Sequence, residues 1–272
     1  MRLRSRADQR PAWIDEALRF EPGSLLPWVV GDDRVGWLRH DLRAVLGYRW
    51  SSVFVPRDGA LQLHERLDSI EARSHAVAEV LAMLRQSGWV RGWRDEHYAV
   101  LGETDNAIKL TMERAAVKRF GVRGRAAHLN GVVRTPAGIS IWIAKRSESK
   151  PVDPGRFDNL VGGGIAAGSD VAATLIKECW EEAGIPAQLA ARAGAVDGMR
   201  FECLDPEGVD ANQIYAFDLE LPSDFVPSNQ DGEVERFELV PSYRVREMIA
   251  EPNLLTIDAA LVTLACLERW SV

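Results

Sequence analysis

The chain has 272 residues, of which 46% are hydrophobic and 27% are charged, and its formal net charge at pH 7 is −7. This composition is that of an ordinary globular protein, and the length fits one large domain or two smaller ones. The negative charge disfavours a nucleic-acid partner, because such binding depends on clustered basic surface. A local basic pocket for a small-molecule diphosphate is compatible with that total.

The three cysteines, Cys179, Cys203 and Cys266, lack C-x-x-C spacing and are odd in number. They are therefore expected to be reduced thiols in a cytoplasmic protein. No apolar run reaches the roughly 18 residues that cross a membrane, so no membrane partner is expected. The start of the chain, residues 1–10, is basic but is not followed by an apolar segment, which disfavours a secretory signal. An organelle transit peptide is the weaker alternative.

Residues 1–120 are predicted to form a smaller α+β domain with a role in substrate recognition. Glycine-containing turns separate short apolar runs, which is the pattern of hairpin strands, and apolar residues at helical spacing mark the helix over 69–87. In chain order, the expected helices are 13–20, 41–46, 69–87 and 113–120, and the expected strands are 26–30, 35–38, 52–55 and 60–63.

Tryptophans are concentrated in this first unit, and they have two interpretations. They can stack on a heteroaromatic ligand or pack in the core, and the large area that an aromatic ring buries favours the core. The segment 93–96, Trp-Arg-Asp-Glu, either presents polar groups to a ligand or forms a surface turn with local ion pairs. The tryptophans concerned are Trp13, Trp28, Trp37, Trp50, Trp89 and Trp93.

Residues 121–272 show a different pattern, in which longer strands flank a few helices. Such an order predicts an α/β/α sandwich with a mixed sheet. The expected strands are 127–134, 139–145, 157–161, 191–202, 213–220 and 233–240, and the expected later helices are 242–250 and 254–269, with Asn253 as the cap of the last one.

The segment 163–185 joins a glycine-rich turn to a helix. Ser169 and Asp170 are good N-cap residues, and Gly184 followed by Pro186 ends the helix. Between them, apolar residues recur at helical spacing and predict a buried face. Loop, helix and loop are therefore the expected local architecture.

The opposite face of this helix carries Glu178, Glu181 and Glu182, at spacings that place them side by side. Like charges at these spacings repel by about 0.2–0.5 kcal/mol per pair in water, so a plain surface helix rarely gathers them. Carboxylate oxygens are the ligands that hard divalent cations prefer. The helix is therefore the predicted metal site.

The segment resembles the Nudix box, G-x5-E-x7-R-E-U-x-E-E-x-G-U, in which U is an aliphatic residue. The matching residues are Gly163, Glu178, Glu181, Glu182, Gly184 and Ile185. Ser169 stands at the first glutamate of the pattern, Lys177 stands at the arginine, and Cys179 takes an aliphatic place. The resemblance implies the sandwich fold of Nudix hydrolases and a diphosphate substrate.

The resemblance also implies a divalent cofactor, Mg²⁺ or Mn²⁺, bound by Glu181 and Glu182 with a backbone carbonyl near Gly163. Glu178 is then a further ligand or the base that activates water, and Lys177 orients it. Glu178, Glu182 and Lys177 are the expected catalytic residues. A lysine ammonium cannot reproduce the bidentate fork of arginine, so the positioning is expected to be looser.

Because Ser169 leaves the site one carboxylate short of the pattern, a replacement is expected from a neighbouring loop. Many Nudix enzymes use a late glutamate in this way, and Glu233 is the candidate ligand here. An exposed acidic start of a strand is the competing interpretation of Glu233 and Glu235.

The substrate is expected to contact cations that precede the helix, Lys145, Arg146 and Lys150, since such side chains neutralise phosphate oxygens. A solvated strand end is the alternative. Asn159 joins the substrate-binding set through a closer resemblance, which covers nearly the whole chain from about residue 20. The segments that carry it are 93–98, 128–131, 145–150, 154–155 and 158–159.

This closer resemblance is to the Nudix subfamily that is joined to thiamine pyrophosphokinase in fungi. It implies hydrolysis of thiamine diphosphate and, preferentially, of its damaged oxo and oxy analogues. The competing hypotheses are a hydrolase of nucleoside diphosphate derivatives, a non-catalytic ligand-binding protein on the Nudix scaffold, and an isomerase of allylic diphosphates. A homodimer is also left open.

Overall fold

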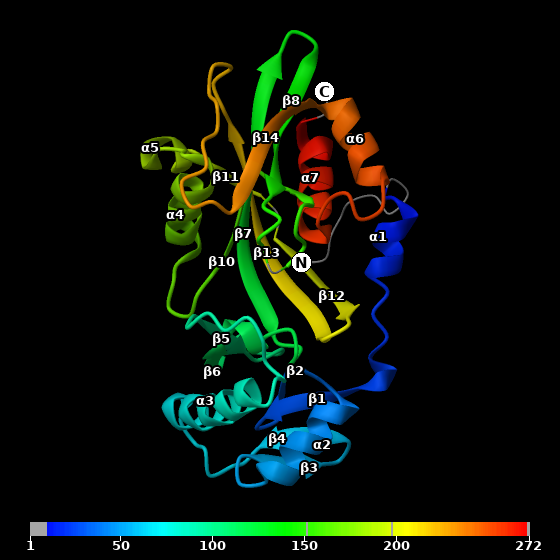
Figure 1. The fold of residues 1–272 in the computed structure, drawn as a ribbon, viewed down its shortest axis with the longest axis vertical. Coiled ribbons are helices and arrows are strands. Elements are labelled where there is room, and N and C mark those ends of the chain that lie inside the picture. Colours follow the sequence, from blue (N-terminus) through cyan, green and yellow to red (C-terminus); the bar gives the residue numbers. More distant parts are fainter. Residues whose placement is uncertain (1–9, 151, 197, 271–272) are drawn as a thin grey trace.

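The computed structural model describes residues 10–150, 152–196 and 198–270. The prediction about a leader segment concerns the first ten residues, of which 1–9 lie outside the described part. Within the described part, no helix is both long and apolar enough to span a membrane. Figure 1 shows two packed regions, with the N-terminal elements at one end and the long strands of the second half at the other.

The first region is built on a four-stranded sheet with the strand order β2-β1-β4-β3. A two-stranded hairpin, β5–β6, lies between this region and the long strands (Figure 1). The elements are η2 (Pro22–Ser24), β1 (Leu25–Val30), β2 (Asp33–Arg39), α2 (His40–Arg49), β3 (Phe54–Arg57), β4 (Ala60–Leu63), α3 (Ile70–Gln86), β5 (His97–Leu101), β6 (Ile108–Glu113) and η3 (Arg114–Ala116).

An aromatic cluster forms the core of this region. The ring of Trp28 contacts that of Phe120 edge-on at a centroid distance of 5.2 Å, and Phe54 packs beside both. The other tryptophans of the first unit are half-buried and pack against hydrophobic clusters. The core-packing interpretation of these tryptophans is therefore confirmed.

The predicted helix over 113–120 is wrong. The chain continues as strand β6 up to Glu113 and then makes only a short 3₁₀ turn. Leu110 and Met112 alternate with less buried residues, so the segment has the period of a strand. The sequence pattern also does not predict hairpin β5–β6, because its strands are short and their pairing is irregular.

The second region is an eight-stranded mixed sheet with the main order β11-β13-β7-β8-β14. Strand β7 pairs in parallel with β13 and antiparallel with β8. The strands are β7 (Arg123–Thr135), β8 (Gly138–Arg146), β9 (Phe157–Asp158), β10 (Val161–Gly164), β11 (Gly194–Ala195), β12 (Met199–Asp205), β13 (Gly208–Glu220) and β14 (Val234–Pro241).

Helices cover both faces of this sheet, which confirms the α/β/α sandwich (Figure 1). One hydrophobic cluster lies under α4, and a separate one lies under α6 and α7. The helices of this region are α4 (Val171–Ala183), α5 (Ala187–Ala190), α6 (Ser242–Ala250) and α7 (Ile257–Trp270).

Three local predictions for the second half need correction. The expected strand over 191–202 is two strands, β11 and β12, preceded by the short helix α5. The last helix begins at Ile257, and its cap is Thr256, whose Oγ1 accepts from the backbone N–H of Ala259 at 3.2 Å. Asn253 instead has φ +64°, so it makes a turn before the helix.

The first helix, α1 (Ala12–Ala17), packs on the second region although it belongs to the first part of the sequence (Figure 1). Ile14 is fully buried in the cluster under α6 and α7, and Trp13 donates from Nε1 to the carbonyl of Ile249 at 2.8 Å. The chain therefore crosses from one region to the other before β1.

Candidate active site

The glycine-rich segment is a strand rather than a loop. Strand β10 pairs antiparallel with β7, with Gly163 opposite Ala127. Helix α4 follows, and its N-cap Asp170 accepts from the backbone N–H groups of Ala172 and Ala173 at 2.9 and 3.1 Å. At the other end, Gly184 has φ +64°, the left-handed conformation that ends a helix. The predicted helix bounds are confirmed.

Glycine is required in β10 because side chains lie directly on the strand. A Cβ on Gly163 would overlap the side chain of Glu178, and a Cβ on Gly164 would overlap the hydroxyl of Tyr98. On its other face, α4 buries Leu175, Cys179 and Ala183 against the sheet. The strand and the helix therefore fix the glutamates next to the glycine backbone.

Glu182 is the most buried of the three glutamates, with an exposed fraction of 6%. Its Oε2 accepts from the backbone N–H of Gly162 at 2.8 Å. Burial raises the pKa of Glu182 to about 8, against the lowering effect of that hydrogen bond, and the charge of Asp158 raises it further. Burial also raises the pKa of Glu178, against the opposing charge of Lys177.

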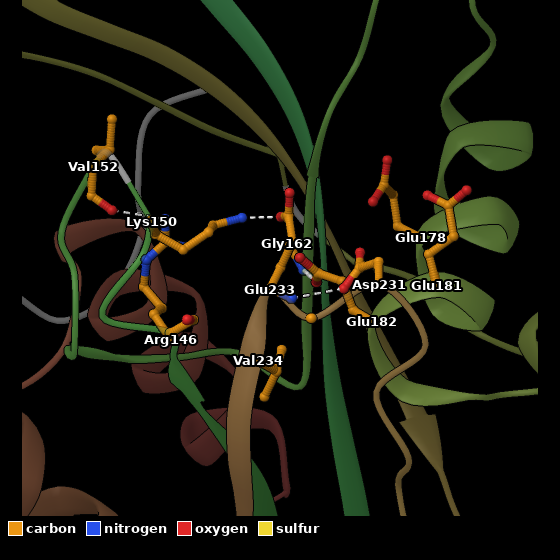
Figure 2. Close-up of polar contacts among 12 residues, drawn as sticks. Arg146, Lys150, Val152, Gly162, Glu178, Glu181, Glu182, Asp231, Glu233 and Val234 are labelled. Atoms are coloured by element: carbon orange, nitrogen blue, oxygen red, sulfur yellow. Dashed lines mark hydrogen bonds and ion pairs between the residues drawn. The ribbon is translucent and has the colours of Figure 1, made fainter. Parts of the chain in front are cut away.

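Lys177 lies between the other two glutamates. Its Nζ is 2.5 Å from Oε2 of Glu181 and 3.3 Å from Oε1 of Glu178. The predicted contact with Glu178 is present, but the shorter contact is with Glu181. Both glutamates extend from α4 toward the same side in Figure 2.

These residues line a cavity of about 480 Å³. One wall is β10 and the acidic face of α4, and Ser169 also lies on this cavity. The loop before β14 adds Asp231 and Glu233, and Lys150 faces them. Glu233 and Lys150 form an ion pair with each other, as the dashed line in Figure 2 shows. Sequence reasoning missed Asp231, whose pKa is raised by burial.

The remaining wall comes from the first region, which adds Arg94, Glu96 and Arg114. Arg114 pairs with Glu96 at 2.8 Å, and its guanidinium stacks over the ring of Tyr98 at 5.4 Å. The backbone N–H of Arg94 donates to buried Glu113 at 2.9 Å. The only signal in the sequence was the polar segment 93–96, and nothing pointed to Arg114.

Three of the predicted substrate-binding residues lie outside this cavity. Lys145 pairs with Glu235 at 2.9 Å on the surface. Arg146 pairs with Asp158 at 2.8 Å and donates to the carbonyl of Val152 at 2.8 Å. It therefore stabilises the loop between β8 and β9. It lines a second cavity that adjoins the first.

Asn159 does not contact this cavity, and its assignment to substrate binding is corrected. Its side chain is 2% exposed, and its amide is occupied inside the protein. Nδ2 donates to Asn130 and Thr263, each at 2.9 Å, and Oδ1 lies 2.9 Å from Nδ1 of His128. No group of this amide is left for a ligand.

The donor set around the cavity fits a hard divalent cation. Carboxyl groups of Glu178, Glu181, Glu182 and Asp231 line one space. Burial raises the pKa of Glu178, Glu182 and Asp231, and a bound cation would favour their charged forms. In the described part of the chain, no three such side chains converge as a ready-made ligand cluster.

Comparison with known proteins gives two family models that follow one another along the chain. Residues 12–124 match a domain of unknown function, DUF4743, and residues 125–259 match the NUDIX domain. The glycine strand and the carboxylate helix lie within the second match, whereas Arg94 and Arg114 lie within the first.

Two similar relatives come from Arabidopsis thaliana. The chain is 36% identical over 248 residues to Nudix hydrolase 24, chloroplastic, covering 91% of this chain and 68% of the relative. It is 35% identical over 255 residues to Nudix hydrolase 20, chloroplastic, with the same coverage of 91% and 68%. Among solved structures, that of DR0079 from Deinococcus radiodurans aligns with 18% identity and a TM-score of 0.48, over 65% of this chain and 100% of that one.

Proposed function

Because the chain belongs to the Nudix hydrolase family and is a pyrophosphohydrolase, we propose that its substrate is thiamine diphosphate or a damaged oxo or oxy analogue. Water adds to phosphorus, the bond between that phosphorus and the bridging oxygen breaks, and the products are the monophosphate and inorganic phosphate. Nudix hydrolases generally use divalent metal ions, and we propose Mg²⁺ or Mn²⁺ for this one.

The main support for the proposal is that acidic and basic side chains line different sides of the first cavity. The carboxylates of α4 line one side, and Arg94, Arg114 and Lys150 line the others. A diphosphate with its metal needs both kinds of group in one space, since cationic side chains neutralise phosphate oxygens and carboxylates hold the ion. The glycine backbone of β10 lines the same cavity.

We assign the roles as follows. Glu181 and Glu182 hold the ion, with the backbone near Gly163 and with Asp231 or Glu233 supplying a further oxygen. A divalent ion held there would neutralise charge that develops on the phosphate oxygens. Glu178 takes the proton of the attacking water, for which its raised pKa suits it. Lys177 positions Glu178 and Glu181.

The substrate class is supported by the resemblance to the thiamine-linked Nudix subfamily and by a second cavity next to the first. The alternatives are a hydrolase of nucleoside diphosphate derivatives and, because Ser169 replaces an expected ligand, a non-catalytic ligand-binding protein. A further proposal is that the chain divides near residue 120, with the first domain contributing to substrate recognition. A homodimer and a cytoplasmic location stay predictions; the free cysteines suit the latter.

The test is turnover of a panel that includes thiamine diphosphate, oxythiamine diphosphate, ADP and ADP-ribose, each with Mg²⁺ and with Mn²⁺. We expect the thiamine compounds to have the highest kcat/KM. Glu182→Gln should lower kcat by about 100-fold or more, since it weakens a ligand without changing the shape of the side chain. The exposed Glu251→Gln is the matched control. A higher kcat/KM for ADP-ribose refutes the substrate, and binding without any turnover refutes the reaction.

A further inference from the structure

A second cavity, of about 380 Å³, opens from the proposed active site. The two cavities share Arg94, Arg114 and the glycine strand Gly162–Gly164 as wall residues. A ligand can therefore extend from the carboxylate helix past these arginines into the second space. This volume lies in the range of about 300–1,000 Å³ that is typical of small-molecule pockets.

The second cavity has a different chemical character away from the shared wall. Cationic and acidic side chains both line this part, and several of them pair with each other. Lys118 Nζ pairs with Asp210 at 2.8 Å and with Asp205 at 3.4 Å, and Arg146 pairs with Asp158 at 2.8 Å. Asp258 also lines the cavity, and its Oδ1 is buried without a hydrogen-bond partner among the described residues. The cavity thus contains an acceptor that nothing in the described chain satisfies.

Helix formation alone does not account for Asp258. It is the second residue of α7, where a carboxylate is favoured by the helix dipole. A fully exposed position would give that benefit with full hydration, whereas Asp258 is half-buried and its Oδ1 is shielded from solvent. Here burial raises the pKa of the Asp258 carboxyl well above its usual range, and the nearby charges of Asp210 and Asp158 add to this effect. A donor or a cation from a ligand would remove the penalty.

An unsatisfied donor lies on the same cavity. Arg125 is half-buried, its guanidinium lies over the ring of Tyr215 at 5.5 Å, and its Nε has no hydrogen-bond partner in the described part of the chain. One free acceptor and one free donor in a pocket of this size are typical of a site for a polar heterocycle.

We propose that the second cavity binds the non-phosphate half of the substrate, and that Asp258 accepts a hydrogen bond from an N–H group, or pairs with a positive charge, on that half. The substrate class is therefore the diphosphate ester of an alcohol that carries an amino or cationic heterocycle. This inference rests on the proposed hydrolase function for the position of the diphosphate, which lies at Arg94 and Arg114.

The test compares wild type with Asp258→Ala on two substrates. On this proposal thiamine diphosphate reaches both cavities, whereas methyl diphosphate, which lacks the heterocycle, reaches only the first. We expect kcat/KM for thiamine diphosphate to fall by about 10- to 100-fold, mainly through KM, because the acceptor is lost from a buried site. Turnover of methyl diphosphate should stay within about twofold, since the metal site is untouched. Glu268→Gln on the same helix is the matched control.

A second readout does not depend on catalysis. Calorimetric titration of free thiamine into metal-free protein should give a Kd that is about tenfold or more weaker for Asp258→Ala than for wild type. Asp258→Asn, which keeps the side-chain shape, should bind thiamine with intermediate affinity. Thermal unfolding of all variants shows whether the helix end is intact.

The possible results are distinguishable. Equal KM and equal thiamine affinity in wild type and Asp258→Ala overturn the inference, and so does an equal loss on both diphosphates accompanied by a fall in Tm. If thiamine binds in an Asp258-dependent manner but no diphosphate is hydrolysed, the proposed function fails and the assignment of the cavity stands.

Discussion

Single residues in the proposed active site are constrained more by their neighbours than by their own conformation. Gly163 is the clearest case. Its place on β10 is an ordinary strand position, yet a Cβ there would overlap the Glu178 side chain. The Glu178 carboxylate can therefore keep its position only because residue 163 has no side chain.

We expect Gly163→Ala to lower kcat by about 100-fold while the protein stays folded. The added methyl group displaces Glu178, and a misplacement of about 1 Å at a reacting group has an effect of this size. Steady-state kinetics and Tm measure the two quantities. Gly194→Ala is the matched control, since its Cβ would meet its neighbour at an ordinary 3.8 Å. Full activity of Gly163→Ala would refute a role for Glu178 at its observed position.

The cysteine thiols are expected to be unreactive in the folded protein. Burial raises the pKa of Cys203 to about 12, and the thiolate is the reactive form. The pKa of Cys203 in the folded protein lies above the ordinary thiol pKa of about 8.5. Its contribution to the free energy of unfolding is therefore fully present below about pH 8.5 and is lost as the pH rises toward the folded pKa.

A disulfide-exchange reagent at pH 8 should therefore modify native protein about 100-fold or more slowly than protein in guanidinium, where every thiol becomes accessible. Absorbance of the released thiolate measures the rate. The Cys203→Ser variant should lose one equivalent of reaction in guanidinium only. A fast native phase that disappears in Cys203→Ser would show that this half-buried thiol is not shielded from the reagent.

At the scale of elements, the turn after β6 places the two arginines of the first region. Glu113 is 2% exposed, and its Oε1 accepts from the backbone N–H of Arg94 at 2.9 Å and of Ala115 at 3.1 Å. One carboxylate therefore ties the loop before β5 to the 3₁₀ turn after β6. Arg94 and Arg114 are carried on these two segments.

Glu113→Ala should lower the free energy of unfolding by about 1–3 kcal/mol, because two partly buried N–H groups lose their acceptor. It should also raise KM for the diphosphate, since both arginines lose their support. Urea unfolding and steady-state kinetics measure these effects. Glu113→Gln keeps an oxygen in place and is expected to stay near wild type in KM. If Glu113→Ala leaves KM unchanged, the arginines do not depend on this junction.

The helices and strands differ in how well the local sequence predicts them. Helix α4 carries its own caps, its buried face and its carboxylates within one continuous segment, so local pattern was sufficient. Hairpin β5–β6 and the short turn at Arg114 depend on packing against α3 and the glycine strand. Their sequence pattern is weak without those neighbours.

Only those residues of the proposed site that lie close together in the sequence were predictable. Glu178, Glu181 and Glu182 were found because they are close in sequence. Arg114 and Asp258 come from segments far from the glycine strand, and only tertiary packing brings them to the two cavities. Asn159 shows the opposite error, since a residue next to the site in sequence has its side chain inside the sandwich.

At the scale of the whole molecule, the proposed active site is lined by both regions. The sandwich supplies the carboxylates and the glycine strand, and the first region closes the cavity with Arg94 and Arg114. Helix α1 links the two regions from the other side, through the burial of Ile14 beneath α6 and α7. The position of the first region relative to the sandwich therefore sets the position of Arg94 and Arg114 in the cavity, and through them the proposed phosphate contacts.

This arrangement predicts that the double variant Arg94→Ala/Arg114→Ala raises KM for the diphosphate by about 10- to 100-fold, because two charge-assisted contacts with phosphate are lost. The dependence of KM on salt should weaken at the same time, since fewer exposed charges then attract the substrate. Kinetics over a range of ionic strengths measure both quantities. Arg49→Ala, at the end of α2 in the same region, is the matched control and should behave as wild type. An unchanged KM and an unchanged salt dependence in the double variant would show that the sandwich binds the diphosphate alone, and the first region would then have no part in phosphate recognition.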